Sequence, residues 1–331
     1  MKMKNRFFRS LICLALSCIM VFSAASALAE PIRVAVVQPM THTSLDQIRD
    51  TIIAALEASD IEFEIVTKNA ERDTAALSTI LENVKMDGVD ILVPIATNTA
   101  QSAKVIFEDG LIPVVFAAVS DPVAAGLTGD DSFFITGVSN NIPAGEIVKL
   151  ISDFQPDYKK IGFLYTSSET NSVSTINAAK AYCDENGIAY EEVSISNLSE
   201  LQTAVETLIS KGIDALYTGN DNSIASAMST YIDVAYSYGV PVYCGADSMV
   251  ADGGFATIGV DYVQLGNQVA DIVIRLAKGE KPEDIPYETL SDYARFVNLQ
   301  AAGTLGMEIT EDILSAYRVL VEADGASHFG E

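Results

Sequence analysis

The chain has 331 residues, with 45 acidic against 20 basic side chains and a formal net charge of −25 at pH 7. This charge argues against nucleic acid or an anionic membrane surface as a partner, because both are polyanions and the sequence has no basic patch. The two histidines, His42 and His328, have no Cys or His at ligand spacing, so we expect no metal site. The length predicts two domains, each able to bury a core.

The first 29 residues have the pattern of a secretory signal peptide. Four basic residues precede an apolar run over 11–22, and Ala27-Leu28-Ala29 forms a cleavage site before Glu30. The run is too short to span a membrane, so we expect an exported, periplasmic protein that begins at Glu30. Cys18 follows a loose lipoprotein cleavage box, which leaves anchoring at the outer face of the cell membrane as the alternative.

Beyond residue 30, short apolar strands alternate with longer amphipathic helices. In the first half we expect strands at 32–37, 62–66, 91–95 and 113–117, and helices at 45–58, 74–85 and 99–107. Strands that read as continuous apolar runs between helices indicate a parallel sheet covered on both faces.

The same alternation repeats in the second half. We expect helices at 143–154, 173–186, 198–211 and 224–238, and strands at 160–165, 189–195, 215–217 and 240–244. Two such series predict an α/β fold of two doubly wound parallel-sheet lobes joined by crossover strands.

The remaining segment predicts a returning strand, a long helix, another strand and a last helix, at 253–260, 262–278, 295–299 and 310–322. These elements add crossings between the lobes, so each lobe is expected to be discontinuous in sequence. The N-terminal lobe would take residues 30–141 plus about 260–290, and the C-terminal lobe 142–259 plus about 291–331.

Polar side chains gather where predicted strands end, which is the edge at which parallel sheets bind ligands. The candidate ligand-binding residues are Thr97, Asn98, Thr99, Ser120, Asp121, Asn140, Ser168, Glu169, Thr170, Asn171, Asp221, Asp247 and Asp261. Helix capping explains one such residue per helix, whereas several of these loops carry more polar groups than capping needs.

Catalytic motifs are missing from the sequence. There is no nucleophile elbow, no glycine-rich dinucleotide motif after the first strand and no phosphate-binding loop, and neither histidine lies in the predicted site loops. Asp121, Asp221 and Asp247 suit helix capping or ammonium binding better than acid–base chemistry. The pattern therefore favours binding over catalysis, and a secreted enzyme acting on a small metabolite is the less favoured alternative.

Five segments carry a family resemblance: 93–101 (VPIATNTAQ), 113–127 (PVVFAAVSDPVAAGL), 247–250 (DSMV), 254–266 (GFATIGVDYVQLG) and 279–286 (GEKPEDIP). The chain resembles the ABC-transporter substrate-binding proteins of the tryptophan/tyrosine-binding-like group, which have the periplasmic binding protein type I fold. The resemblance implies three crossover strands, a small-molecule ligand in the cleft between the lobes, ABC permease and ATPase subunits as partners, and no cofactor.

The resemblance further implies capture of an aromatic or other apolar amino acid by hinge closure. We expect the α-carboxylate near 167–171 or 97–99 and the ammonium on Asp221 or Asp247. Pro39-Met40-Thr41-His42 stands where many relatives carry an acidic-His-Pro sequence, so the family's first-loop contact does not carry over. A ligand-binding sensory subunit is the alternative function.

Overall fold

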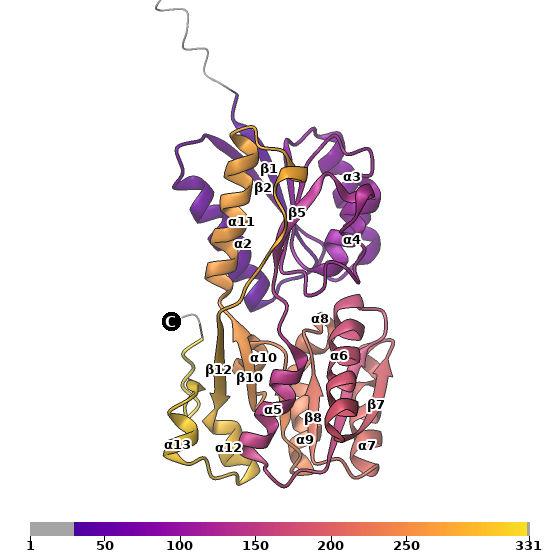
Figure 1. Ribbon diagram of the computed structural model, residues 1–331, viewed down its shortest axis with the longest axis vertical. Coiled ribbons are helices and arrows are strands. Elements are labelled where there is room, and N and C mark those ends of the chain that lie inside the picture. The colour runs from indigo at the N-terminus through magenta and orange to yellow at the C-terminus, as the bar shows by residue number, and fades with distance from the viewer. Residues whose placement is uncertain (1–29, 330–331) are drawn as a thin grey trace, which may run out of the picture.

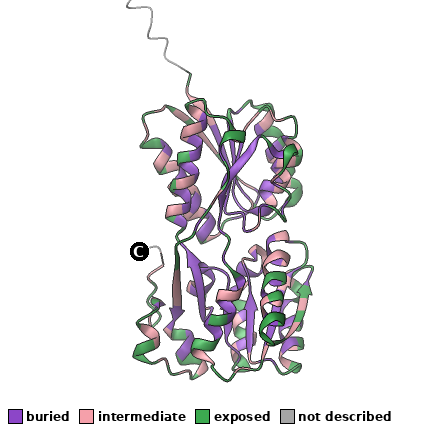
Figure 2. Cartoon of the chain, in the orientation of Figure 1, coloured by how far each residue is buried: buried purple, intermediate pink, exposed green. Residues whose placement is uncertain are grey.

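The computed structural model describes residues 30–329, so the predicted signal peptide and Cys18 lie outside the described residues. Two lobes are stacked end to end along the long axis of the molecule (Figure 1). In both, the central strands are buried and the outward sides of the helices are exposed (Figure 2). Among the described residues, no helix is long and apolar enough to cross a membrane.

The first lobe is built on a parallel sheet of six strands in the order β11-β5-β4-β3-β1-β2. Its strands are β1 (Ile32–Gln38), β2 (Phe63–Asn69), β3 (Ile91–Pro94), β4 (Val114–Ala117), β5 (Ile135–Ser139) and β11 (Glu288–Thr289). Its helices are α2 (Thr43–Glu57), α3 (Thr74–Met86), α4 (Thr97–Ile106) and α11 (Tyr262–Ala277).

Alternation along β1 explains why helices cover both faces of this sheet. Val34 and Val36 pack in one core with α2 and α11, whereas Ala35 and Val37 pack in another with α3 and α4. Successive strand residues point to opposite faces, so a run that is apolar at every position requires a helix layer on each side. Figure 1 shows α2 beside α11 and α3 beside α4.

The second lobe has a sheet of seven strands in the order β13-β12-β10-β9-β8-β6-β7, parallel except that β10 pairs antiparallel with β12. Its strands are β6 (Lys160–Thr166), β7 (Ala189–Ile195), β8 (Ala215–Thr218), β9 (Val242–Cys244), β10 (Ala256–Val260), β12 (Tyr293–Asn298) and β13 (Arg318–Val321). Its helices are α5 (Ala144–Phe154), α6 (Thr170–Asn186), α7 (Leu201–Ser210), α8 (Asn222–Ala225), α9 (Met228–Ser237), α10 (Asp247–Ala251), α12 (Leu299–Leu305) and α13 (Glu311–Leu314). The expected α/β class is therefore confirmed.

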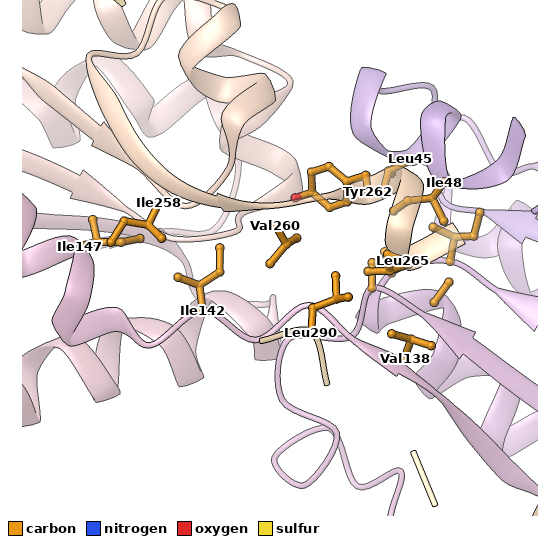
Figure 3. Packing of buried hydrophobic residues seen from close by; sticks show 14 of the residues in the cluster. Leu45, Ile48, Val138, Ile142, Ile147, Ile258, Val260, Tyr262, Leu265 and Leu290 are labelled. Carbon is orange, nitrogen blue, oxygen red and sulfur yellow. The ribbon is translucent and has the colours of Figure 1, made fainter. Parts of the chain in front are cut away.

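Within residues 30–329 the chain crosses between the sheets three times, after β5, after β10 and after β11. Each crossing contributes one buried apolar residue to a shared core: Ile142, Val260 and Leu290. Figure 3 shows these side chains between the cores of the two lobes. The three segments that join the lobes, which form the hinge region, therefore pack in a common apolar core.

Two expected helices are wrong. The helix predicted at 224–238 is broken into α8 and α9, because Asp221 caps a short first turn and Ala227, at φ −125° and ψ 24°, leaves the helical conformation. The helix predicted at 310–322 is replaced by α13 and the strand β13. The branched apolar residues of 319–321 pair with β12 at the sheet edge, where β propensity and burial outweigh the helical periodicity.

Candidate functional site

A small cavity of about 50 Å³ lies between the lobes, at the carboxyl ends of both sheets. The first lobe lines it with His42, Ser44, Thr97, Ser120 and Asn140, among others. The second lobe adds Asn171, Asn220, Asp221, Asn222 and Ser248, again among others. Polar side chains therefore face the cavity from both lobes, beside apolar ones such as Leu45, Met249 and Tyr262, so both lobes can contact one small molecule.

The N-termini of two helices form part of the first-lobe wall of the cavity. Ser44 and Thr97 lie in the first turns of α2 and α4, and neither N-cap residue, His42 or Ala96, makes a side-chain capping hydrogen bond. Their terminal N–H groups and positive dipole ends favour an anion. The strands leading to this wall end in a strained backbone, since Ala96 and Ala118 have φ values of 71° and 56°.

Close approach of two loops positions the second-lobe wall. A Cβ atom at Gly245 would collide with the backbone of Gly219 and Asn220. Glycine therefore lets the loop after β9 approach the loop after β8, which carries Asn220. The cavity residues Asn220 and Ala246 lie on these two loops.

Three side-chain atoms of the cavity residues are buried and find no hydrogen-bond partner among residues 30–329. They are His42 Nε2, Asn171 Oδ1 and Asn220 Oδ1. Burial lowers the pKa of His42, so its imidazole is neutral near pH 7. A buried polar atom without a partner costs free energy, and a bound ligand can supply the missing donors to the two amide oxygens.

The buried carboxylate of Asp221, in the second lobe, already accepts hydrogen bonds from the protein itself. Asp221 accepts four hydrogen bonds, from Thr166 N, Thr166 Oγ1, Ser172 Oγ and Ile224 N, at 2.6–3.0 Å. Four donors fill the lone-pair positions of a carboxylate, so the geometry favours a structural role for Asp221 over the expected role as ammonium partner. Burial, and then the charge of Glu169, raise the pKa of Asp221.

Glu169 has a similar structural role. Its carboxylate accepts from Asn222 N and Nδ2, at 2.9 Å each, and from Ser223 N and Oγ, at 2.8 and 2.6 Å. These bonds hold the start of α8 in place beside the cavity.

Asp247 and Asp261 lie outside this cavity and line a pocket beside the hinge. Asp261 caps α11 by accepting from Val263 N and Gln264 N. Asp247 accepts from Ser248 N, and burial raises its pKa to about 6. Its neighbour Ser248 lines the cavity, so the geometry favours Ser248 over Asp247 as a residue that contacts the ligand.

Among the described residues, side-chain hydrogen bonds connect helices and loops of the two lobes. Ser44 Oγ bonds Ser248 Oγ at 2.7 Å, Thr170 Oγ1 donates to Gln101 Oε1 at 3.4 Å, and Ser174 Oγ donates to Asp121. The first is inside the cavity and the other two join α6 to the first lobe. The structure is therefore in a closed arrangement.

The predicted site residues fall into separate groups. Thr97, Ser120, Asn140, Asn171 and Asp221 line the cavity; Asn98, Ser168 and Glu169 line a second chamber; Asp247 and Asp261 line the hinge pocket; Asp121 and Thr170 join the lobes; Thr99 is buried in α4. Sequence reasoning did not select His42, Ser44, Asn220 and Ser248, although each lies in or beside a polar loop that follows a strand.

Comparison with known proteins identifies the family. The profile of the family described as "ABC transporter substrate binding protein" matches residues 33–320, so the chain belongs to this family. It is a substrate-binding protein and not an enzyme. The "Tyrosine-binding protein" of Clostridioides difficile is 31% identical over 278 residues, which cover 82% of this chain and 80% of that protein.

Two solved structures are informative about the arrangement of the lobes. The complex of an ABC domain with L-Trp from Streptococcus pneumonia is 32% identical, has a TM-score of 0.81 and matches 88% of this chain and 99% of that chain. The ligand-free, open structure of a substrate-binding protein with adhesive properties from Clostridium difficile is 29% identical, with a TM-score of 0.67 over 87% of this chain and 98% of that chain. The TM-score is higher against the L-Trp complex than against the ligand-free, open structure.

The fold extends to more distant proteins. The glucose-galactose binding protein GanP from Geobacillus stearothermophilus is only 14% identical but has a TM-score of 0.63 over 81% of this chain and 98% of that chain. This likeness concerns the two-lobed fold alone.

Proposed function

We propose that this substrate-binding protein captures an aromatic or other apolar amino acid between its lobes and delivers it to an ABC permease. One observation carries the proposal: the buried amide oxygens of Asn171 and Asn220 lack partners within the described chain and line the same cavity as the uncapped N-termini of α2 and α4. Amide oxygens accept hydrogen bonds from an ammonium group, and helix N-termini bind a carboxylate. An amino acid carries both groups on one carbon atom.

The lack of basic side chains in the described cavity lining supports an amino acid as the ligand. Among the described residues that line it, none is arginine or lysine. Dicarboxylates and phosphorylated ligands usually recruit a guanidinium, so a zwitterionic head group fits better. The printed names of the tyrosine-binding relative and of the L-Trp complex support the same class.

Capture proceeds by hinge closure. A ligand that touches both walls binds the closed form more tightly than the open form, so its binding energy shifts the equilibrium towards closure. The bonds from Ser44 to Ser248 and from Ser174 to Asp121 then form across the cleft. The closed form docks on the permease, which is driven by its ATPase.

Export completes the proposal. We infer that residues 1–29 are removed, that the protein works in the periplasm, and that Glu30 becomes its first residue. Intact-mass measurement of the exported protein tests this, since a lipid-modified N-terminus at Cys18 would instead mean anchoring at the membrane.

A thermal-shift screen of the twenty amino acids, common nucleosides and common sugars tests the ligand class. A ligand at 100 times its Kd adds ~2.7 kcal/mol of stability, which corresponds to a rise in Tm of roughly 5–10 °C. We expect such a shift with tyrosine, tryptophan or phenylalanine. A shift with sugars or nucleosides only would contradict the proposal.

A further inference from the structure

Glu169 is a buried carboxylate that no basic side chain among residues 30–329 neutralises. The residue is 3% exposed, and its two oxygens accept hydrogen bonds from Asn222 and Ser223 of α8 at 2.6–2.9 Å. These donors are neutral, and none of the ion pairs within the described chain includes Glu169. Glu169 precedes α6, whose N-terminus carries only a partial positive charge. Its support of α8 therefore leaves most of the buried charge without a counter-ion, which costs free energy.

The same carboxylate fixes the orientation of the Asn171 side chain, which lines the polar cavity. Asn171 Nδ2 donates to Glu169 Oε2 at 3.3 Å and to Asn220 O, so both of its hydrogens are used. Its Oδ1 is buried and has no partner among the described residues. Turning the amide over would lose both bonds and place Oδ1 against two other acceptors. Asn171 can therefore offer a ligand its acceptor oxygen and no donor.

A second buried carboxylate adds to the negative charge on this side of the cavity. Asp221 is 1% exposed, and the charge of Glu169 contributes to raising the pKa of Asp221. The hydrogen-bond donors to Asp221 are neutral as well. The described cavity lining has no arginine or lysine, and burial lowers the pKa of His42. A positive charge on the ligand would therefore be attracted by two carboxylates that have no basic partner.

We propose that Glu169 is a positioning residue that selects for an amine on the ligand, because it orients Asn171 and places a negative charge behind the amide. The inference rests on the proposed function, since it assumes that the ligand ammonium enters the polar cavity. Glu169 does not line that cavity, so it acts through Asn171. A charged acceptor behind the amide polarises it and strengthens the hydrogen bond that Asn171 Oδ1 accepts from the ammonium.

Two ligands separate this role from simple support of α8. L-Tyrosine and 3-(4-hydroxyphenyl)propionic acid share the ring and the carboxylate, and only L-tyrosine carries an ammonium group. Titration calorimetry gives the ratio of their affinities, from which damage that weakens both ligands equally cancels. In the wild-type protein we expect a ratio of at least about tenfold in favour of L-tyrosine.

Neutralising Glu169 should abolish most of this ratio. Glu169→Gln keeps the side-chain volume and one acceptor oxygen but removes the charge, so the ratio should fall below about threefold. Asp214→Asn is the matched control. The Asp214 carboxylate also accepts two hydrogen bonds in the second lobe, from Lys159 N and Lys160 N at 2.7 and 2.9 Å, and Asp214 does not line the cavity. The ratio should keep its wild-type value in this control.

Asn171→Ala is the second test, and it serves if Glu169→Gln does not fold. Glu169 keeps its four bonds from α8 in this variant, so the fold should survive while the link to the ligand is removed. The ratio should again fall below about threefold.

Three results separate the inference from the proposed function. Loss of the ratio in Glu169→Gln and Asn171→Ala, with the wild-type ratio in Asp214→Asn, supports the inference. The wild-type ratio in Glu169→Gln or in Asn171→Ala overturns it, even if both ligands bind more weakly, and leaves the proposed function intact. A wild-type protein that binds the two ligands equally, or binds no amino acid, overturns the proposed function and the inference with it.

Discussion

The hydroxyl oxygen of Ser44 lies 2.7 Å from that of Ser248, and this hydrogen bond joins the first turn of α2 to the first turn of α10 across the cleft. Both side chains are buried, at 4% and 1% exposure. The bond exists only when the lobes are together, so it contributes to closure and not to the folding of either lobe.

The Ser248→Ala variant should therefore bind its amino acid less tightly. Loss of one hydrogen bond costs the closed form ~1 kcal/mol, which lowers affinity about fivefold. Calorimetry with L-tyrosine measures this. Ser237→Ala is the control, because the Ser237 hydroxyl donates to Val234 O within α9 and Ser237 does not line the cavity. Equal affinity in both variants would show that the hydroxyl pair plays no part in closure.

Asn220→Ala should weaken amino-acid binding more strongly. Its Oδ1 is buried without a partner among the described residues, so removing it leaves the folded protein intact and deprives the ligand ammonium of an acceptor. Hydrogen bonds to a charged group contribute ~1.5–3 kcal/mol, so affinity should fall about 10- to 100-fold. Calorimetry gives the affinity, and urea unfolding should give an unchanged free energy of unfolding.

In contrast to Asn220→Ala, the Asp221→Ala variant should lose stability. It leaves donors from Thr166, Ser172 and Ile224 without their acceptor, so unfolding should become easier by at least ~2 kcal/mol. If Asp221→Ala instead kept full stability and lost only ligand affinity, the structural role assigned to this carboxylate would be wrong.

Gly245→Ala should reduce both stability and binding. The added Cβ meets the backbone of Gly219 and Asn220, so the two loops must separate and Asn220 must move. We expect a loss of ~1–3 kcal/mol, the range found for overpacking. Gly303→Ala is the matched control, since an added Cβ there meets no described atom within 4 Å and the position is helical. Alanine should be neutral or stabilising at Gly303 by up to ~1 kcal/mol.

The pH dependence of the free energy of unfolding should reveal the raised pKa of Asp247. Burial raises its pKa to about 6, above the usual value near 3.9, so the folded protein holds this proton more tightly than the unfolded chain. Its stabilising contribution is complete below pH ~4 and is lost as the pH rises through about 6. Asp247→Asn should remove this loss.

Urea unfolding at several pH values tests whether Asp247 causes this loss of stability. Relative to wild type, the Asp247→Asn variant should gain ~2 kcal/mol of stability between pH ~4 and pH ~7.5. A difference between the two proteins that stays constant over this range would contradict the raised pKa. Comparing the two proteins cancels His42, whose lowered pKa acts in the opposite direction.

The sequence is sufficient to predict the two-lobed α/β fold, because the apolar strands and amphipathic helices have distinct periods. It does not predict β5, in which Gly137 interrupts the run at φ 154° to let the Phe116 carbonyl approach. Nor does it predict β11, which is two residues long and is defined by its pairing with β5. Both strands are set by contacts distant in sequence.

The site is less predictable than the fold. Polar loops at strand ends indicate the cleft, but they do not say which side chain faces it. Ser248 and Asp247 are adjacent in the first turn of α10, about 100° apart around the helix axis, and Ser248 lines the cavity while Asp247 lines the hinge pocket. Sequence also cannot show that Asp221 is already saturated by donors, since Thr166 lies 55 residues away.

Recognition of an amino-acid head group is the central claim, and calorimetry of the ligand-stripped protein tests it most directly. The ligands are L-tyrosine, tyramine, which lacks the carboxylate, and 3-(4-hydroxyphenyl)propionic acid, which lacks the ammonium. We predict that L-tyrosine binds and that losing either charged group lowers affinity at least tenfold, since each makes charge-assisted hydrogen bonds. Equal binding of all three compounds, or binding of none of the twenty amino acids, would contradict the account.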